Sequence, residues 1–160
     1  MSFIKLLFTF VLSYKNMFSK SCEYGIRAAI YVAKHSLKNR KVSLKEVALH
    51  TDAPAAFMAK ILQKLTRTEI LSSLKGPTGG FFVPLEKIET ISVLSIVLAM
   101  DGDGIFEDCT LGLRRCDGQK PCPMHFSFIK IREEMRASLE ANTLKLLAEE
   151  VSDGVTFLKR

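Results

Sequence analysis

A Gly-Pro-Thr-Gly-Gly segment at residues 76–80 constrains the fold of this chain more than any other feature. Glycine adopts the left-handed backbone conformations of tight turns at little cost, so glycines around a proline predict a sharp chain reversal. The short runs on either side, residues 70–74 and 81–83, predict two strands paired as a hairpin. The segments that precede the hairpin then decide what kind of domain carries it.

Three helices are predicted before the hairpin. The segment "SCEYGIRAAIYVAKHSL" places apolar side chains close to a helical repeat and begins at Ser21, which we expect to cap it. Ser43 stands three residues before Glu46, which is the spacing of a capping box and predicts a short second helix. Pro54 then favours the first turn of a third helix, which carries an apolar stripe along one face. Helix, tight turn and helix predict a helix-turn-helix, and the hairpin that follows is its wing.

Basic charge is concentrated in the same half of the chain. The protein has 160 residues, of which 48% are hydrophobic, and a formal net charge of +6. Residues 20–75 hold 11 lysines and arginines against 4 acidic residues, whereas residues 76–160 hold 10 against 13. We therefore expect one ordinary domain with a hydrophobic core and a basic face. Such a face suits a phosphate polymer or an anionic membrane, and a merely soluble basic surface is the alternative.

The third helix and the wing supply the residues expected to contact double-stranded DNA. Lys75 at the wing tip, beside flexible glycines, is placed to meet the phosphate backbone or to enter the minor groove. Gln63 is the best candidate for reading bases, because the alanines around it touch a thymine methyl group at most. The predicted DNA-binding residues are Ala55, Ala56, Lys60, Gln63, Lys64, Arg67, Lys75, Gly76, Thr78 and Gly79. A helical hairpin in an ordinary α-rich core is the competing interpretation.

The segment "CTLGLRRCDGQKPCPMH" holds three of the chain's 4 cysteines and one of its 3 histidines. Glycines and prolines interrupt regular structure there, which allows Cys109, Cys116, Cys122 and His125 to converge on a metal. Zinc sites usually contain close Cys-x2-Cys pairs, and both gaps between the cysteines are wider here. Cysteine thiolates also hold iron-sulfur clusters, and basic residues in the loop would favour thiolates and offset an anionic cluster. An iron-sulfur cluster, a structural zinc ion and a metal-free thiol switch are the three possibilities.

The last segment predicts assembly of two chains. Apolar side chains recur at three- and four-residue steps through residues 126–149. A helix of that length is about 36 Å long at 1.5 Å per residue, too long to bury its whole stripe on so small a domain. A second copy of the chain would cover the stripe and give a homodimer. The predicted dimerisation residues are Phe128, Ile131, Met135, Leu139 and Leu146, and a helix folded back on its own domain is the alternative.

Together, "YGIRAAIYVA", "AKILQKL", "LKGPTGGFFV" and the cysteine loop resemble the Rrf family of winged-helix transcriptional regulators over residues 17–148. The wing is the most specific piece. The family pattern is Arg-Gly-Pro-x-Gly-Gly-Tyr, and here Lys75 and Phe81 keep the charge and the aromatic ring. Ala55, Ala56 and Ala59 stand where relatives often carry polar side chains, so a relative's operator sequence does not transfer to this chain.

The resemblance implies an iron-sulfur cluster and makes it the preferred cofactor. In the branch of the family that regulates cluster assembly, a histidine at the position of His125 completes the ligands of a [2Fe-2S] cluster, which we therefore favour over [4Fe-4S]. In the branch that is sensitive to nitric oxide, the fourth ligand is an acidic residue on the first helix of the partner subunit, and Glu23 matches it. We expect the ligands to be Cys109, Cys116, Cys122 and His125, with Glu23 as the alternative fourth ligand.

The chain divides into an apolar extension (1–16), a winged helix-turn-helix domain (17–100), a cluster-binding loop (101–125), a dimerisation helix (126–149) and a tail (150–160). The extension is too short to span a bilayer, and we expect synthesis to start at Met17, with an export signal as the alternative. The overall prediction is a mainly α, cytoplasmic, homodimeric DNA-binding regulator with no membrane partner, whose cluster changes its affinity for DNA. No enzyme is expected, because the sequence has no catalytic pair or phosphate-binding loop. A redox or metal-storage protein and a zinc-stabilised DNA-binding module are the alternatives.

Overall fold

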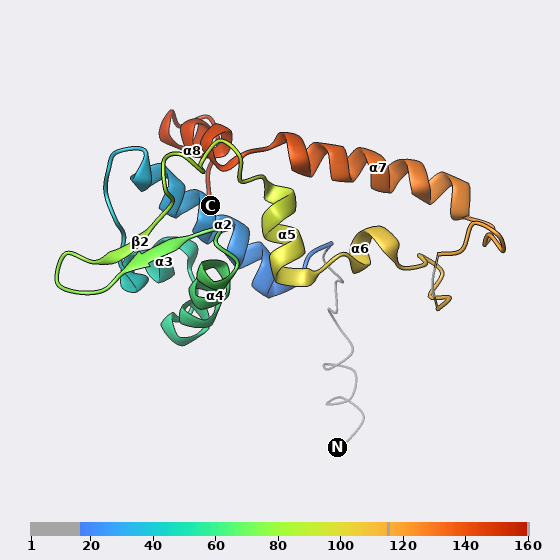
Figure 1. The fold of residues 1–160 in the computed structure, drawn as a ribbon, viewed down its shortest axis with the longest axis horizontal. Coiled ribbons are helices and arrows are strands. Elements are labelled where there is room, and N and C mark those ends of the chain that lie inside the picture. The colour runs from blue at the N-terminus through green and yellow to red at the C-terminus, as the bar shows by residue number, and fades with distance from the viewer. Residues whose placement is uncertain (1–16, 115, 160) are drawn as a thin grey trace, which may run out of the picture.

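The computed structural model describes residues 17–114 and 116–159, so the predicted extension at residues 1–16 lies outside the described residues. Seven helices and two short strands in this part of the chain confirm the predicted mainly α winged helix-turn-helix fold (Figure 1). The helices are α2 (Lys20–Ser36), α3 (Leu44–Thr51), α4 (Ala55–Arg67), α5 (Val93–Asp101), α6 (Gly104–Glu107), α7 (His125–Ala141) and α8 (Leu144–Ser152), and the strands are β1 (Ser72–Leu74) and β2 (Gly80–Phe82). None of the described helices is long and apolar enough to cross a membrane.

Helix α2 forms the centre of the domain, and α3, α4, α5 and α8 all pack against it. Its small side chains allow this close approach, because Cys22, Ala28 and Ala29 are completely buried among the neighbouring helices. The expected cap at Ser21 was wrong. Ser19 caps the helix instead, and its hydroxyl accepts a hydrogen bond from the backbone N–H of Cys22. Ser19 is additionally held by Asp101, a contact between distant residues that the local sequence pattern does not reveal.

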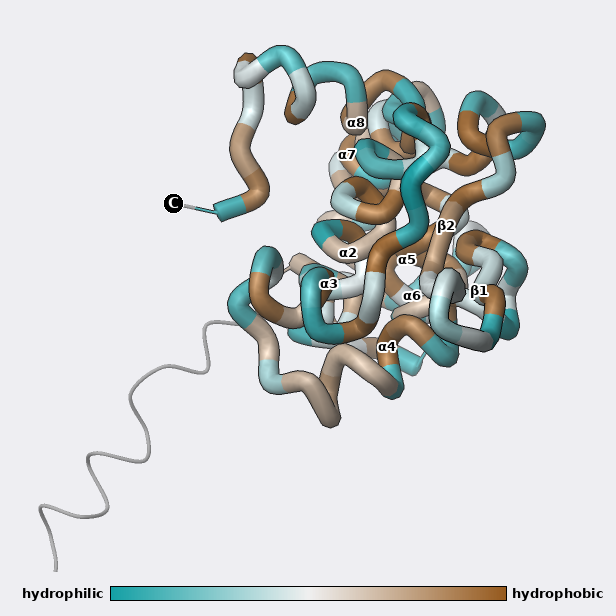
Figure 2. Tube along the Cα trace, turned by 90° about the vertical axis from the view of Figure 1, so that its left-hand side faces the viewer, coloured by the Kyte–Doolittle hydropathy of each residue, from teal (hydrophilic) through white to brown (hydrophobic). Residues whose placement is uncertain are grey.

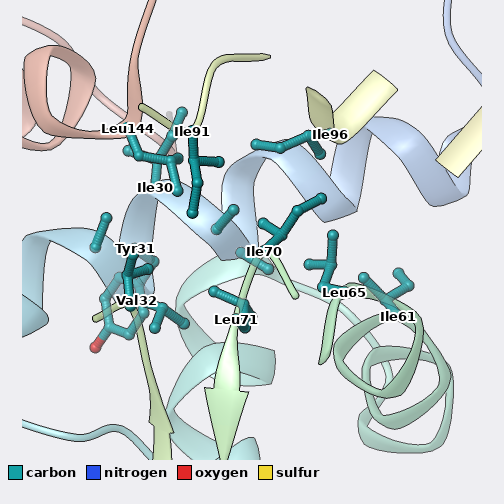
Figure 3. Packing of buried hydrophobic residues seen from close by; sticks show 14 of the residues in the cluster. Ile30, Tyr31, Val32, Ile61, Leu65, Ile70, Leu71, Ile91, Ile96 and Leu144 are labelled. Atoms are coloured by element: carbon teal, nitrogen blue, oxygen red, sulfur yellow. The ribbon is translucent and has the colours of Figure 1, made fainter. Parts of the chain in front are cut away.

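The helices are stacked on both sides of α2. Figures 1 and 2 show α7 and α8 on one side of it and α3 and α4 on the other, with α5 alongside α2. The core fills the spaces between these layers (Figure 3). Ile30, Ile91 and Leu144 meet where α8 covers α2, whereas Ile61 and Leu65 pack on the side of α4. One hydrophobic core therefore supports both the helix-turn-helix and the C-terminal helices.

The helix-turn-helix forms as the sequence predicts. At the start of α3, the Ser43 N–H donates to the Glu46 carboxylate at 2.8 Å, and the Glu46 N–H donates to the Ser43 hydroxyl at 3.3 Å. Asp52 ends α3 in the left-handed conformation, with a φ of 61°. Helix α4 begins directly after Pro54 and buries its apolar stripe, of which Met58, Ile61, Leu62 and Leu65 are nearly or fully inaccessible. The outer face of α4 is thereby left to solvent.

The wing is an antiparallel hairpin in which Ser73 lies opposite Phe81. Its turn requires glycine, because a Cβ atom on Gly79 would lie 2.1 Å from the Leu74 carbonyl oxygen. The base of the wing is fixed to the segment before α3. There the Val42 N–H donates to the Phe81 carbonyl at 3.0 Å, and the Phe81 N–H donates to the Val42 carbonyl at 2.8 Å. The wing is therefore held in a fixed position beside the helix-turn-helix.

The single helix expected over residues 126–149 is divided into two. Helix α7 ends at Ala141, and Thr143 adopts an extended conformation and caps α8 by accepting a hydrogen bond from the Leu146 N–H. The chain at the break pairs with the start of α5, where the Val93 N–H donates to the Asn142 carbonyl at 2.8 Å. The break also turns Leu144 into the core, where it is completely buried. Leu146, which we expected on the dimerisation helix, consequently lies on α8, the helix that folds back onto α2.

Candidate functional site

The outer face of α4 carries all six predicted DNA-binding residues of this helix in exposed positions. The exposed residues are Ala55, Ala56, Lys60, Gln63, Lys64 and Arg67. In the wing, Lys75, Gly76 and Thr78 are exposed and Gly79 is half-buried. A groove of about 390 Å³ lies between these two elements, lined by Gln63 and Arg67 from α4 and by Ser73 and Phe81 from the hairpin. Amide, guanidinium and hydroxyl groups thus border one groove, and these groups suit both base edges and phosphates.

Lys64 has a second role that its sequence position did not reveal. Its ammonium group donates a hydrogen bond to the Met100 carbonyl at the end of α5, at 2.8 Å. Carbonyl groups in the last turn of a helix have no partner within that helix and carry its partial negative charge, so a cation is favourable there. The contact joins α4 to α5 and restricts the freedom of Lys64 to reach DNA.

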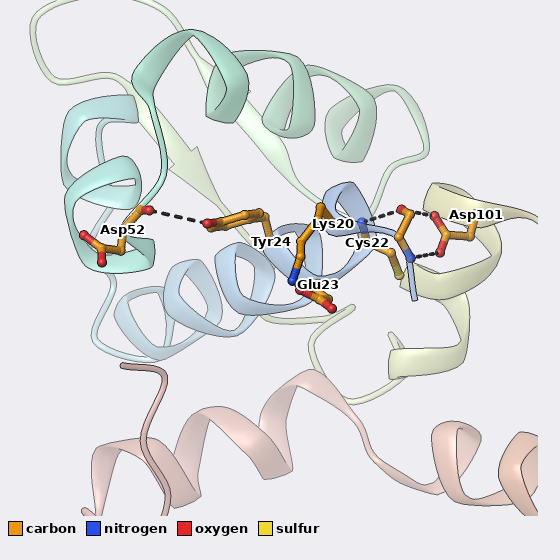
Figure 4. Close-up of polar contacts among 7 residues, drawn as sticks. Lys20, Cys22, Glu23, Tyr24, Asp52 and Asp101 are labelled. Carbon is orange, nitrogen blue, oxygen red and sulfur yellow. Dashed lines mark hydrogen bonds and ion pairs between the residues drawn. The ribbon is translucent and has the colours of Figure 1, made fainter. Parts of the chain in front are cut away.

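The next residue of α5, Asp101, joins the same region to the start of α2 (Figure 4). Its carboxylate accepts hydrogen bonds from the Ser19 backbone N–H, at 2.8 Å, and from the Ser19 hydroxyl. Cys22 lies beside it. Burial of the Cys22 thiol raises its pKa to about 12, and the charge of Asp101 adds to the rise. Cys22 is therefore a neutral thiol in the core, and Asp101 is a linking residue that no local sequence pattern reveals.

The structure brings the predicted cluster ligands together as two pairs. In the first pair, the Cys116 sulfur lies 3.2 Å from His125 Nδ1. The His125 ring is buried at the start of α7, with only 6% of the residue exposed. The second pair consists of Cys109 and Cys122, which interact through their side chains. Among the described residues, no three His, Cys, Asp or Glu side chains are close enough to share a metal ion. A four-ligand site would require the two pairs to move together.

The surroundings of the Cys109 sulfur lower the pKa of its thiol. Burial opposes this by favouring the neutral thiol, but hydrogen bonds from the backbone N–H groups of Leu111 and Leu113 lower the pKa. The Cys122 side chain and the positive charge of Arg132 act in the same direction, so that the pKa of Cys109 lies below the ordinary value. Backbone N–H donors to sulfur are a typical setting of cysteine ligands in iron-sulfur proteins. The donor set of three thiols and an imidazole is also one that such clusters accept.

A cavity of about 620 Å³ opens beside the first pair. Cys116 and His125 line it, and Arg132 and Arg136 of α7 lie on its wall. Glu107 and Glu133 lie on the same wall, so the cavity beside the Cys116 sulfur is lined by two guanidinium groups and two carboxylates. The position of Arg132 in the sequence does not reveal this placement, because no local pattern shows which part of the chain an arginine will reach.

Glu23, the alternative fourth ligand, lies in the first turn of α2. Its carboxylate accepts a hydrogen bond from the Lys20 ammonium group at 2.8 Å (Figure 4). Of the two candidate fourth ligands, His125 lies against a loop cysteine, with its Nδ1 atom 3.2 Å from the Cys116 sulfur. Glu23 was predicted as a ligand for the cluster of a partner subunit, and that arrangement exists only in a dimer.

The predicted dimerisation residues of α7 form a partly uncovered apolar face. Ile131 is 53% exposed, whereas Phe128, Met135 and Leu139 are half-buried. A groove of about 550 Å³ runs beside them and is lined by Phe128, Ile131 and Met135 together with Met17 and Ile105. The single chain therefore leaves apolar side chains of α7 in contact with water.

The family model described as Rrf2, iron-dependent transcriptional regulator, matches residues 18–150. An Aquifex aeolicus protein named as an HTH-type transcriptional regulator is 26% identical over 131 residues, covering 81% of this chain and 89% of that protein. The HTH-type transcriptional regulator IscR of Sodalis glossinidius is 26% identical over 134 residues, covering 82% and 79%. Among solved structures, IscR of T. potens has a TM-score of 0.68 at 19% identity, covering 86% of this chain and 90% of that one. CymR, the global cysteine regulator of B. subtilis, has a TM-score of 0.65 at 22% identity, covering 82% and 95%. At these identities the structures support the fold alone.

Proposed function

The chain belongs to the Rrf2 family of transcriptional regulators, and we propose that it is a cytoplasmic homodimer that senses redox state, nitric oxide or iron-sulfur status through a cluster in its cysteine loop. Regulators of this family bind DNA, and the helix-turn-helix and wing are the parts of this chain built for it. The chain is a regulator and not an enzyme.

For DNA recognition, we assign the major groove to α4 and the flanking backbone or minor groove to the wing. Lys60 and Arg67 would neutralise phosphates, and Gln63 would read bases from the exposed face of α4. The small side chains of Ala55 and Ala56 would allow the start of α4 to approach thymine methyl groups closely. Lys75, Gly76, Thr78 and Gly79 form the tip of the wing, and Lys64 would contribute charge while it remains bound to α5.

The ligands we propose are Cys109, Cys116, Cys122 and His125. The observation that supports this set most strongly is the contact between the Cys116 sulfur and His125 Nδ1 at 3.2 Å, because it joins a loop thiol to a buried imidazole. We favour [2Fe-2S] over [4Fe-4S], since histidine replaces cysteine in some [2Fe-2S] centres. When bound, the cluster would supply a centre whose occupancy and oxidation state depend on iron, oxidants or nitric oxide.

The residues of this chain provide a connection between the loop and the recognition helix. Cys109 follows α6, and α6 follows the end of α5. At that end the Met100 carbonyl binds Lys64 of α4, and Asp101 binds Ser19 at the start of α2. We propose that ordering of the cysteine loop shifts the population of α5 and α4 orientations and so changes the affinity for DNA.

For assembly, we propose that α7 packs against α7 of a second copy. The apolar face around Ile131 is uncovered in the single chain, and a self-complementary contact between two copies would remove it from water. Two helix-turn-helix units related by a two-fold axis would then meet two half-sites on DNA.

The cluster is tested by anaerobic purification followed by an absorption spectrum and by iron and sulfide analysis. We expect visible absorption near about 400 nm that is lost when Cys109, Cys116 or Cys122 is replaced singly by alanine, while the protein stays helical. If the wild type instead holds stoichiometric zinc and each variant unfolds, the metal is structural and the proposed sensing role is wrong.

The fourth ligand is tested by a pair of variants. We expect His125→Ala to lose or shift the visible spectrum and Glu23→Ala to leave it unchanged. The reverse result would assign the ligand to Glu23 of a second subunit.

DNA binding is tested on genomic fragments with and without the cluster, and we expect a slope of about −5 to −9 in log K against log salt for a dimer that contacts about 6–10 phosphates.

A further inference from the structure

Arg132 of α7 reaches across to the segment that carries Cys109. Its guanidinium group donates to the Phe106 carbonyl at 3.4 Å, to the Asp108 carbonyl, and to the Thr110 hydroxyl at 2.9 Å. These acceptors lie 22 to 26 residues before Arg132 in the sequence and stand on both sides of Cys109. One side chain therefore holds the backbone and a side chain around a proposed ligand.

The acceptors explain why an arginine is needed. Phe106 and Asp108 lie at the C-terminal end of α6, where carbonyl groups have no partner within the helix and attract a cation. The planar guanidinium group carries five N–H donors in a fixed geometry and can serve several acceptors at once, whereas a lysine ammonium group acts as a point charge. The arrangement differs from an ordinary surface ion pair, because two of the three acceptors are backbone carbonyls.

A second arginine strengthens the same attachment. The Arg136 guanidinium carbon lies 4.4 Å from the centre of the Phe106 ring. Residues four positions apart lie on one face of a helix, so Arg132 and Arg136 both point from α7 toward α6. Phe106 itself is 92% buried, as only 8% of the residue is exposed, so the ring is a firm anchor for this contact. Residues 106–110 are thus fixed to α7 at several points.

We propose that Arg132 is a positioning residue, which fixes the Cys109 segment against α7 and so joins the cysteine loop to the helix that we assign to dimerisation. Cys109 is nearly buried, and the acceptors of Arg132 stand directly before and after it in the chain. Arg132 therefore sets the path of the chain on both sides of this cysteine. The positioning itself is a property of the metal-free chain, and only its consequence for a cluster rests on the proposed function.

The positioning is tested first in metal-free, reduced protein by hydrogen exchange of residues 106–113, measured by mass spectrometry. Arg132→Gln should accelerate exchange in this segment roughly tenfold or more, because hydrogen bonds to a charged donor are lost. The exchange rate of Arg132→Lys should lie between those of Arg132→Gln and the wild type. Thr110→Val, which removes one acceptor from the loop side, should produce a smaller increase. Lys130→Gln, a change of an exposed cation on the same helix, should have no effect.

The consequence is tested in cluster-loaded protein by visible circular dichroism and by the reduction potential. Arg132→Gln should change both, and Arg132→Lys should restore much of the wild-type spectrum. Unchanged exchange in both Arg132→Gln and Thr110→Val would overturn the proposal, whether or not a cluster binds. If the wild type binds no cluster but exchange responds as expected, the proposed sensing function fails and the positioning role stands.

Discussion

Replacing Leu144 by alanine should destabilise the protein strongly, because this side chain carries α8 into the core. Leu144 is completely buried and lies next to Ile30 and Ile91 (Figure 3). The substitution removes three carbon atoms, which correspond to roughly 2.4 kcal/mol of lost transfer free energy at about 0.8 kcal/mol each. The cavity that remains adds to this cost, so we expect the free energy of unfolding to fall by about 3–4 kcal/mol, within the range for buried leucines.

Leu146→Ala is the matched control. The same atoms are removed from the same helix, but Leu146 is 43% exposed and no enclosed cavity remains. We expect a loss of about 1 kcal/mol or less. Both variants are compared with the wild type by urea unfolding at one fixed protomer concentration, because the stability of a dimer depends on concentration.

The comparison distinguishes two arrangements of the C-terminal residues. With α8 folded onto α2, Leu144→Ala costs several times more than Leu146→Ala. With a continuous helix through residues 126–149, Leu146 would belong to the apolar stripe and Leu144 would not. Equal losses, or a larger loss for Leu146→Ala, would refute the break at Thr143 and the packing of α8 that follows from it.

Glu46→Gln should lower the free energy of unfolding by about 1 kcal/mol at neutral pH, because it weakens the capping box of α3. Hydrogen bonding to the Ser43 backbone N–H lowers the pKa of Glu46. The carboxylate therefore stabilises the fold above the ordinary glutamate pKa, and this stabilisation is lost as the pH falls through the lowered pKa. The thermal unfolding temperatures of Glu46→Gln and wild type should therefore become equal in acid. Ile131→Glu should convert the proposed dimer to monomers in analytical ultracentrifugation, because it places a charge on the uncovered face of α7. In anisotropy titrations, Gln63→Ala should reduce operator discrimination by about 1–3 kcal/mol per half-site. Lys75→Ala should instead weaken all DNA sequences similarly and lower the salt slope by up to about two units in the dimer.

Each of these results has a contrary outcome. If the unfolding temperatures of Glu46→Gln and wild type differ by the same amount down to strongly acidic pH, the carboxylate does not provide the cap. A dimer that survives Ile131→Glu would place the contact between subunits elsewhere. Equal loss of specific and non-specific binding in Gln63→Ala would make Gln63 a backbone contact, and selective loss in Lys75→Ala would make the wing a reader of bases.

The parts of the fold that were predictable from the sequence are those specified by local chemistry. Ser43 and Glu46 satisfy each other's backbone within one turn, so their spacing alone identifies the start of α3. The wing turn is equally local, since the space around Gly79 excludes any larger residue. The apolar stripe of α4 follows from helical periodicity. These features need no information about distant residues.

The features that were missed depend on contacts between distant segments. The apolar spacing of residues 126–149 continues through Thr143, and the break arises because residues 142–144 pair with the start and the approach of α5. The position of Lys64 on α4 suggests a cation that faces DNA, and its hydrogen bond to the Met100 carbonyl of α5 is visible only in the fold. Arg132 likewise acquires its role from a loop more than 20 residues away. Sequence periodicity describes the face of a helix but not what that face will meet.

Helix α5 connects these distant contacts, which gives the proposed sensing mechanism a physical basis. At its start, the Val93 N–H binds the Asn142 carbonyl, where α7 ends and α8 begins. At its end, the Met100 carbonyl accepts a hydrogen bond from Lys64 of α4, and the chain continues into α6 and Cys109. With 9 residues, α5 is about 13 Å long and buried along much of its length, so it is too short and too well packed to bend easily. A displacement at either end therefore moves the other end as well. Helix α5 contacts both the proposed dimerisation helix α7 and α4. A change in the cysteine loop would therefore reach the proposed DNA-binding surface through α5, and so would a change in the spacing of two subunits.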